Sequence, residues 1–385
     1  MTITVGAPTI DLDSAGSHRV SAQIQGPGVD VQLWYRSQHA IAACPETFVA
    51  ATLLPAMASG ATMRVEAPVS PLFLSNLVAL QDTMAAWYKQ LRPVEIECPI
   101  RPAGGTPDGH EKLSFFSGGV DSFATVVRHR EEITHLLLIR GFDIPLSSVD
   151  LWERVKGELT DAASELRLEL ITVETNAKEL LNRAGDWGLI THGAGLASVG
   201  LLFGDCADRV FIPSTHHVTD LFPWGSHPLL DHLWSTETLR FVHDGGHLTR
   251  VEKTAMIAQN QAAMRHLRVC YKNVQGAYNC GECEKCVRTM IGLSLAGRLR
   301  ECLTFSEDLD RKRLRSVYLT SENDAAFARE NLARALELQR VDIASALQSQ
   351  LWSFDVRRSL DRVKVLARQT PLRSLVTRLT TGQWN

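Results

Sequence analysis

The sequence lacks several features that mark specialised classes of protein. Its formal net charge is only −3 over 385 residues, so it has no global basic field of the kind that attracts nucleic acid. No uninterrupted apolar run approaches the roughly 18 residues that a membrane span needs. The N-terminal residues have no basic stretch before a long apolar core, and no internal repeat or low-complexity tract is visible. These absences predict a protein with a cytoplasmic location, without a secretory signal and without a contact to the membrane.

Patterns of apolar residues predict three regions. Residues 1–108 are expected to form a small α+β module of unknown role, with a hairpin whose strands cover 19–24 and 29–34. Helices are expected in this module at 47–57 and 71–91, and short strands at 61–65 and 94–97. Residues 101–109 are rich in glycine and proline, which is typical of a linker.

Strands and helices alternate in the second region, 109–302. Expected strands cover 113–116, 136–139, 168–173 and 209–213, and expected helices cover 151–166 and 190–203. This alternation predicts an α/β fold, a parallel sheet with helices on both faces. Ligands of such sheets bind at the carboxyl ends of the strands.

The third region, 303–385, is predicted to be a helical extension, with helices at 325–338 and 341–351. Its tail is basic, with arginine or lysine at Arg357, Arg358, Arg362, Lys364, Arg368, Arg373 and Arg378. Such a tail is able to bind RNA or an acidic partner, but a solvated helix face is the favoured interpretation.

A glycine-containing loop connects the first expected strand of the second region to a helix. It reads Ser117-Gly118-Gly119-Val120-Asp121-Ser122. Glycines let backbone amides approach a ligand, the start of the helix adds partial positive charge, and the two serines add hydroxyl donors. The loop therefore predicts a cradle for pyrophosphate. It is not a Walker A loop, because no Gly-Lys-Ser/Thr follows, and the alternative is an ordinary strand-to-helix turn.

Four of the eight cysteines cluster late in the chain, at Cys270, Cys280, Cys283 and Cys286. The last three are spaced as overlapping Cys-x-x-Cys pairs, and Gly281 permits a tight turn between them. Four thiolates complete a tetrahedral Zn²⁺ site with no open position, which predicts structural zinc. An Fe–S cluster and a metal-free dithiol are the alternatives.

The glycine loop and the cysteine cluster together resemble the PP-loop ATP pyrophosphatases, in the branch of 7-cyano-7-deazaguanine synthase, an enzyme of queuosine synthesis. The family pattern is an SGGxDS loop followed by a cysteine and then Cys-Gly-x-Cys-x-x-Cys with an arginine, matched here by Cys280 to Cys286 and Arg288. Lys253 resembles a lysine that the family places before the cysteines, although a surface lysine is the alternative. The resemblance covers roughly residues 110–300.

This resemblance implies an ATP-dependent ligase that adenylates a carboxylate or amide, releases pyrophosphate and hands the product to a nitrogen nucleophile. The resemblance makes four residues catalytic: Ser117, Asp121, Ser122 and Lys253. Asp121 would supply one of the ligands of Mg²⁺. Residues 117–122 would bind ATP together with Gly141 and Asp143, which follow the second strand, where adenine lies in the superfamily.

The substrate segment differs from the family pattern, which is Gly-x-Asn-x-x-Asp followed by Tyr-Pro-Asp. The resemblance therefore predicts the reaction with ATP better than it predicts the identity of the acceptor. Its candidate substrate residues are His216, His217, Asp220 and Trp224, and the alternative role for them is packing. A second zinc held by His217, Asp231 or His232 is a further alternative.

Two other functions stay open at this stage. A sulfur transferase acting on a nucleobase or tRNA needs a persulfide cysteine, for which Cys206 is the candidate. A nucleotide-sensing adaptor would bind a protein partner through residues 1–108. The expected partners are ATP and a small-molecule or peptide carboxylate, with a homodimer also open.

Overall fold

A computed structural model describes residues 1–14, 16–102, 110–305 and 308–368. The chain divides into two compact units, Met1–Cys280 with Glu301–Thr304, and Gly281–Arg300 with Phe305–Asn385. The predicted linker residues 103–109 and the basic residues Arg373 and Arg378 lie outside the described residues. No helix within the described ranges is both long enough and apolar enough to cross a membrane.

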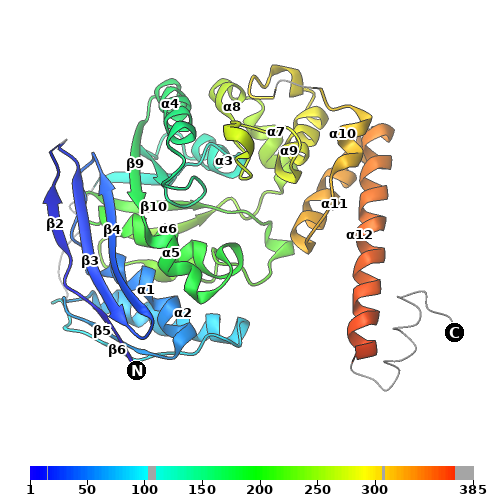
Figure 1. Ribbon diagram of the computed structural model, residues 1–385. Coiled ribbons are helices and arrows are strands. Elements are labelled where there is room, and N and C mark those ends of the chain that lie inside the picture. The colour runs from blue at the N-terminus through cyan, green and yellow to red at the C-terminus, as the bar shows by residue number, and fades with distance from the viewer. Residues whose placement is uncertain (15, 103–109, 306–307, 369–385) are drawn as a thin grey trace. The chain divides into compact units, whose positions relative to one another are not determined.

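The first unit is built on one mixed sheet, which the described residues show with eleven strands (Figure 1). The order is β11-β10-β7-β8-β9-β4-β3-β1-β5-β6, and β2 pairs with β3. The strands are β1 (Thr2–Val5), β2 (Thr9–Leu12), β3 (His18–Gly26), β4 (Val29–Ser37), β5 (Thr62–Val65), β6 (Ile96–Glu97), β7 (Glu111–Phe115), β8 (His135–Arg140), β9 (Glu169–Thr175), β10 (Ala207–Pro213) and β11 (Arg240–Asp244).

The α/β class is confirmed, and the parallel arrangement holds from β9 to β11. In this part β8 pairs in parallel with β7 and β9, and β10 pairs in parallel with β7 and β11. The carboxyl ends of these strands therefore lie at one edge of the sheet. Phe115, which ends β7, lies beside Leu137 of β8, and Pro213 of β10 lies beside Asp244 of β11.

The N-terminal strands do not form a separate sheet. The predicted hairpin is present as β3 and β4, and β4 pairs antiparallel with β9, with Tyr35 beside Thr175. The Thr175 hydroxyl donates to the Trp34 carbonyl at 2.7 Å, and the Trp34 amide donates to Asn176 at 3.0 Å. One apolar core also continues across both regions, so residues 1–102 extend the α/β sheet.

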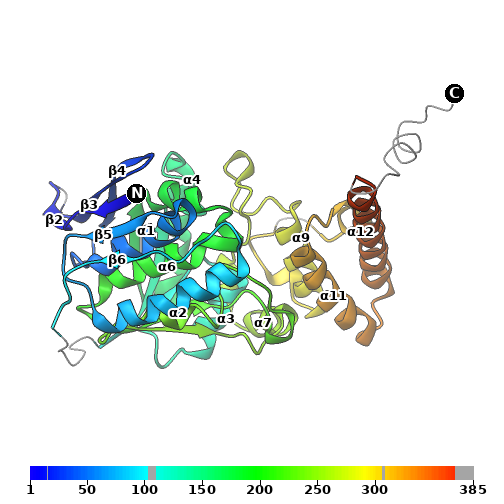
Figure 2. The ribbon, with the colours of Figure 1, turned by 90° about the horizontal axis from the view of Figure 1, so that it is seen from below.

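Helices cover both faces of this sheet. In Figures 1 and 2, α3 and α4 lie on one side, and α1, α2 and α6 lie on the other. The helices of the first unit are α1 (Pro45–Ser59), α2 (Pro71–Trp87), α3 (Val120–Arg128), α4 (Val149–Glu165), α5 (Ala177–Leu181), α6 (His192–Gly200), α7 (Arg250–Ile257) and α8 (Gln261–His266).

The helix predicted at 190–203 is divided into three parts. A π-helical turn, Trp187–Thr191, precedes α6, and a 3₁₀ turn, Leu201–Phe203, follows it. Gly193 lies so close to the next segment that a Cβ there would come within 1.9 Å of the Gly225 carbonyl oxygen. This close backbone approach explains why the sequence has glycine at that position.

The second unit is helical, in agreement with the expected C-terminal helices. It contains α9 (Glu284–Leu295), α10 (Arg311–Ser316), α11 (Glu322–Glu337) and α12 (Val341–Arg368). Ser321 and Asp324 form a reciprocal capping box at the start of α11, which satisfies amides that the first turn leaves open. Buried apolar side chains of α9, α11 and α12, including Ile291, Ala328 and Leu347, form the core of this unit.

Candidate functional site

The glycine loop lies where the sequence predicted it, between β7 and α3. Gly118 has φ +74°, a left-handed conformation that favours glycine. A Cβ on Gly118 would also lie 2.6 Å from Leu159 Cδ2, so a larger residue there would require the Leu159 side chain of α4 to shift. Gly119 is the N-cap of α3 and has no side chain with which to cap the helix. The Ser122 hydroxyl donates to the Gly119 carbonyl at 3.0 Å, which closes the turn.

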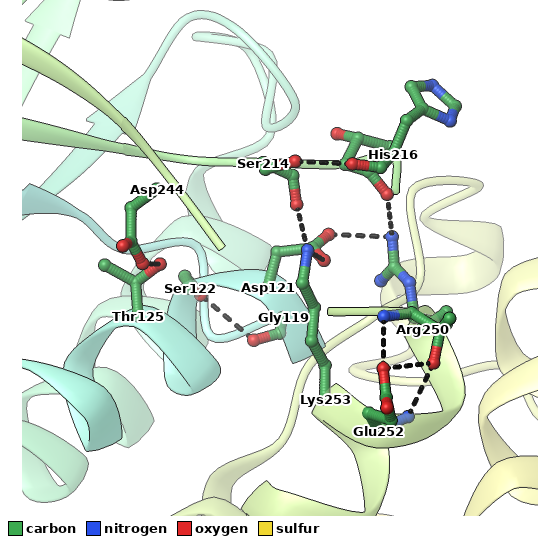
Figure 3. Close-up of polar contacts among 12 residues, drawn as sticks. Gly119, Asp121, Ser122, Thr125, Ser214, His216, Asp244, Arg250, Glu252 and Lys253 are labelled. Carbon is green, nitrogen blue, oxygen red and sulfur yellow. Dashed lines mark hydrogen bonds and ion pairs between the residues drawn. The ribbon is translucent and has the colours of Figure 1, made fainter. Parts of the chain in front are cut away.

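Asp121, in the first turn of α3, receives two cationic side chains from α7 (Figure 3). Its Oδ2 atom lies 2.8 Å from an Arg250 guanidinium nitrogen, and its Oδ1 atom lies 3.3 Å from Lys253 Nζ. The positive end of the α3 dipole lies at the same place, because Gly119 begins the helix. The loop therefore combines a helix N-terminus with two cations and one carboxylate, an arrangement that can attract an anion.

Lys253 is a buried residue, so the alternative of a surface lysine is wrong. Only 2% of it is exposed, and its amino group donates to the Ser214 carbonyl at 2.6 Å. Burial lowers the pKa of the Lys253 amino group, and the negative charge of Asp121 opposes part of that shift. The amino group is thus held between the end of β10 and the start of α3.

The orientation of α7 follows from a local sequence signal. Thr249 and Glu252 form a reciprocal capping box that fixes the first turn of the helix. Arg250 and Lys253 are three residues apart, so they project from the same face of α7. Arg250 was not predicted as a site residue, although this spacing beside a Thr-x-x-Glu motif was visible in the sequence.

A buried carboxylate, Asp244, lies beneath the loop and was also missed. It ends β11, and its oxygens accept from Thr125 at 2.8 Å, from Arg128 at 2.9 Å and from His129 Nε2 at 2.8 Å. The Asp244 carbonyl accepts from the Ser214 amide at 2.7 Å. Asp244 thereby connects α3 to the strand ends that hold Lys253, which makes it a positioning residue.

The two expected adenine-site residues have different surroundings. Gly141 follows β8 with φ +108°, and a Cβ there would lie 1.9 Å from the Thr175 carbonyl oxygen. Glycine is therefore needed at position 141 because the backbone there lies close to the end of β9. Asp143 is exposed, and its carbonyl accepts from Asn273 Nδ2 at 3.0 Å.

The four candidate substrate residues fall into two pairs. His216 is buried, and its ring lies 5.3 Å, centroid to centroid, from that of Trp224. The His216 carbonyl accepts from the Ser214 hydroxyl at 2.7 Å. His217 instead binds the Thr219 hydroxyl at 2.7 Å, and Asp220 is exposed. The structure thus brings the rings of His216 and Trp224 together, close to Ser214. His217 and Asp220 lie on the turn that follows.

A second zinc site from His217, Asp231 or His232 is not assembled. Asp231 is fully buried and accepts from Ser226 at 2.7 Å and from His243 Nδ1 at 2.7 Å, whereas His232 Nδ1 contacts the Pro228 carbonyl. Two groups with metal-ligand spacing occur among the described residues, and neither contains these three side chains.

The predicted zinc ligands form the first of those groups. The sulfur atoms of Cys270, Cys280, Cys283 and Cys286 lie within 4.8 Å of one another. Gly281 has φ +69°, the left-handed turn that the spacing predicted. Asn279 Oδ1 accepts from the Cys270 amide at 3.2 Å, which ties Cys270 to the residue that precedes Cys280. This donor set fits a tetrahedral metal with no open position.

Cys206, the candidate persulfide cysteine, lies at the opposite edge of the sheet. It precedes β10, and its carbonyl accepts from the amide of Glu111, the first residue of β7, at 3.1 Å. The glycine loop follows the other end of β7. Burial raises the pKa of the Cys206 thiol to about 12, and Glu111 adds to the increase, so a thiolate nucleophile is disfavoured.

Comparisons of the chain with protein-family models, with curated proteins and with solved structures find no match. The assignment of a function therefore depends on the residues and the geometry described above.

Proposed function

We propose that this protein is an ATP-dependent, AMP- and pyrophosphate-forming ligase of the PP-loop type, similar to 7-cyano-7-deazaguanine synthase. It would adenylate a carboxylate or amide and hand the product to a nitrogen nucleophile. The observation that supports this most strongly is the position of Lys253 and Arg250, which both contact Asp121 in the first turn of α3. Two cations beside a glycine-bounded helix N-terminus favour a ligand with several negative charges.

Each residue has a task in such a reaction. Adenylation increases negative charge on the departing pyrophosphate, and groups that already point toward that charge lower the barrier. The first amides of α3, the hydroxyl of Ser117 and the amino group of Lys253 would hold the pyrophosphate. The Ser122 hydroxyl would join them by turning away from the Gly119 carbonyl. Arg250 would supply a planar donor for a phosphate oxygen.

Asp121 is the residue that fits Mg²⁺. Each of its oxygens contacts one cation, and an ionised carboxylate has about four lone-pair positions, so capacity for another partner remains. When bound, Mg²⁺ would neutralise phosphate charge. Lys253 and Arg250 would orient the Asp121 carboxylate for that contact.

The acceptor would lie beyond the end of β10, beside the segment that contains Ser214, His216 and Trp224. Backbone and side chains in this segment could hold a heterocycle or a peptide carboxylate. Residues 1–102 extend the same sheet, and a protein partner would bind to these residues. Whether the acceptor is a 7-deazaguanine is a separate proposal from the ATP chemistry.

The products of ATP test this function. Incubation with ATP, Mg²⁺, ammonia and a panel of carboxylates should release AMP and pyrophosphate, whereas ADP and phosphate would refute the proposal. With an ¹⁸O-labelled carboxylate, one label should appear in AMP, because the carboxylate oxygen bonds to the α-phosphorus and leaves with AMP when nitrogen attacks the carbon. An intact triphosphate with every acceptor and with a protein partner present would favour the adaptor.

The sulfur-transferase alternative has a direct test as well. Cys206→Ser would abolish a persulfide-dependent activity, while a ligase would retain its activity. The location of Cys206 at the far edge of the sheet favours the ligase.

A further inference from the structure

A second group of side chains lies at the amino edge of the parallel strands, away from the glycine loop. Glu111 begins β7, Cys206 directly precedes β10, and His39 follows β4. One ligand atom from each of these residues lies within 4.8 Å of the other two. A histidine, a carboxylate and a thiol are the three side-chain types that bind zinc in proteins.

The Glu111 carboxylate is the most informative member of this group. Its Oε2 atom is buried and has no hydrogen-bond donor among the described residues. The same atom lies 3.6 Å from His39 Nε2 and 3.8 Å from His135 Nδ1. These separations are too long for hydrogen bonds, whereas nitrogen and oxygen ligands of one tetrahedral zinc ion lie about 3.3 Å apart.

The surroundings of His39 also match those of a metal ligand. Its Nε2 atom faces Glu111, and its Nδ1 atom faces the Glu169 carboxylate at 3.9 Å. Histidines that bind metals commonly direct the second ring nitrogen toward a carboxylate or water, which fixes the ring. His135 Nδ1 has another partner, the Thr134 hydroxyl at 2.8 Å, so it flanks the group rather than completing it.

We propose that His39, Glu111 and Cys206 bind a single divalent transition-metal ion of the zinc class. Three protein ligands leave the fourth position for water. The ion would tie the loop after β4 to the first residues of β7 and β10, and thereby join the N-terminal strands to the parallel part of the sheet. This site is independent of the nucleotide chemistry proposed above.

Metal content provides the test. The full-length protein is loaded with Zn²⁺, desalted and measured by elemental mass spectrometry, next to the variant His39→Ala/Glu111→Gln. We expect the variant to lose one equivalent of zinc per chain relative to the wild type. The control Cys98→Ser removes a cysteine outside both groups and should leave the zinc content unchanged.

Two results would overturn the proposal. One is an unchanged zinc content in the folded double variant, with folding checked by circular dichroism. If the double variant does not fold, crystals of the wild type soaked in Zn²⁺ decide the question at the zinc absorption edge. An anomalous peak enclosed by His39, Glu111 and Cys206 would support the site, and the absence of that peak would reject it.

Discussion

The amino group of Lys253 lies 3.3 Å from the carboxylate of Asp121, although the two residues are 132 positions apart in the chain. The same amino group donates to the Ser214 carbonyl at 2.6 Å, and the lysine is almost completely buried. Burying a lysine is unfavourable unless its charge is paired and hydrogen-bonded. Asp121 and the Ser214 carbonyl provide this pairing, and the location beside a helix N-terminus is consistent with the role proposed for Lys253 toward an anionic ligand.

Replacement of Lys253 by methionine should lower ATP-dependent pyrophosphate release by about 10²- to 10³-fold, the usual effect of removing one group that stabilises charge in a transition state. Methionine has a similar length but no charge. The measurement is a coupled pyrophosphate assay at saturating ATP.

Lys89→Met is the matched control for this variant, because Lys89 is exposed just beyond α2. It should have the activity of the wild type. Equal activity of Lys253→Met and Lys89→Met would contradict the assignment of Lys253 to the reaction.

The pH dependence of stability should also report on Lys253. Because burial lowers the pKa of its amino group in the folded protein, the unfolded chain binds more protons between that lowered value and the usual lysine pKa of about 10.4. The free energy of unfolding should therefore gain a positive contribution as pH rises through this window. Urea titrations of wild type and Lys253→Met at several alkaline pH values would measure it, and a difference between the two that is independent of pH would contradict it.

The local parts of the site were predictable from the sequence, but their proximity to one another in the fold was not. The glycine loop and the cysteine spacing are contiguous signals, and both have the predicted local geometry. The approach of α7 to α3 depends on how the chain returns to the sheet, which no local pattern specifies. Strand β11 was missed because its sequence, Arg240 to Asp244, alternates weakly and ends in a carboxylate that only a buried network with Arg128 and His129 makes tolerable.

The N-terminal region shows a similar limit. Its hairpin, its two helices and its strand β5 were predicted from periodicity and lie close to the expected bounds. The pairing of β4 with β9 joins residues far apart in the chain. Because strand pairing uses backbone groups, side-chain patterns do not identify the partner strand. That the N-terminal strands belong to the same sheet as β7 to β11 could therefore be learned only from the structure.

Asp244→Asn should destabilise the protein. The substitution keeps the shape but removes the charge that balances Arg128, and breaking a buried ion pair in this way costs about 3 kcal/mol. Urea denaturation would measure the loss. The double variant Arg128→Met/Asp244→Asn should lose less than the sum of the two single variants, since it leaves no uncompensated charge. Additive losses would contradict the proposed coupling.

Gly118→Ala should destabilise the loop for two separable reasons. The left-handed conformation costs an alanine about 1–2 kcal/mol, and its Cβ would collide with Leu159 Cδ2 at 2.6 Å. Adding Leu159→Ala creates space and should recover only the steric part. The cost of Gly118→Ala in the Leu159→Ala background, measured by urea denaturation, should therefore be smaller than in the wild type but not zero. An equal cost in both backgrounds would show that the collision does not contribute.

Loss of metal from the cysteine group should weaken ATP binding as well as stability. The Arg268 amide, two residues before Cys270, donates to the Gly118 carbonyl at 2.7 Å. The segment that a metal at this group would order therefore contacts the glycine loop directly. Cys283→Ser removes one of four ligands and should raise the KM for ATP, with a smaller effect on kcat, because the loop loses a positioning contact rather than a reacting group.

Cys98→Ser, outside both cysteine-containing groups, is the control. If Cys283→Ser loses zinc and folding stability but keeps the KM of the wild type, the hydrogen bond from Arg268 has no part in holding the loop for nucleotide.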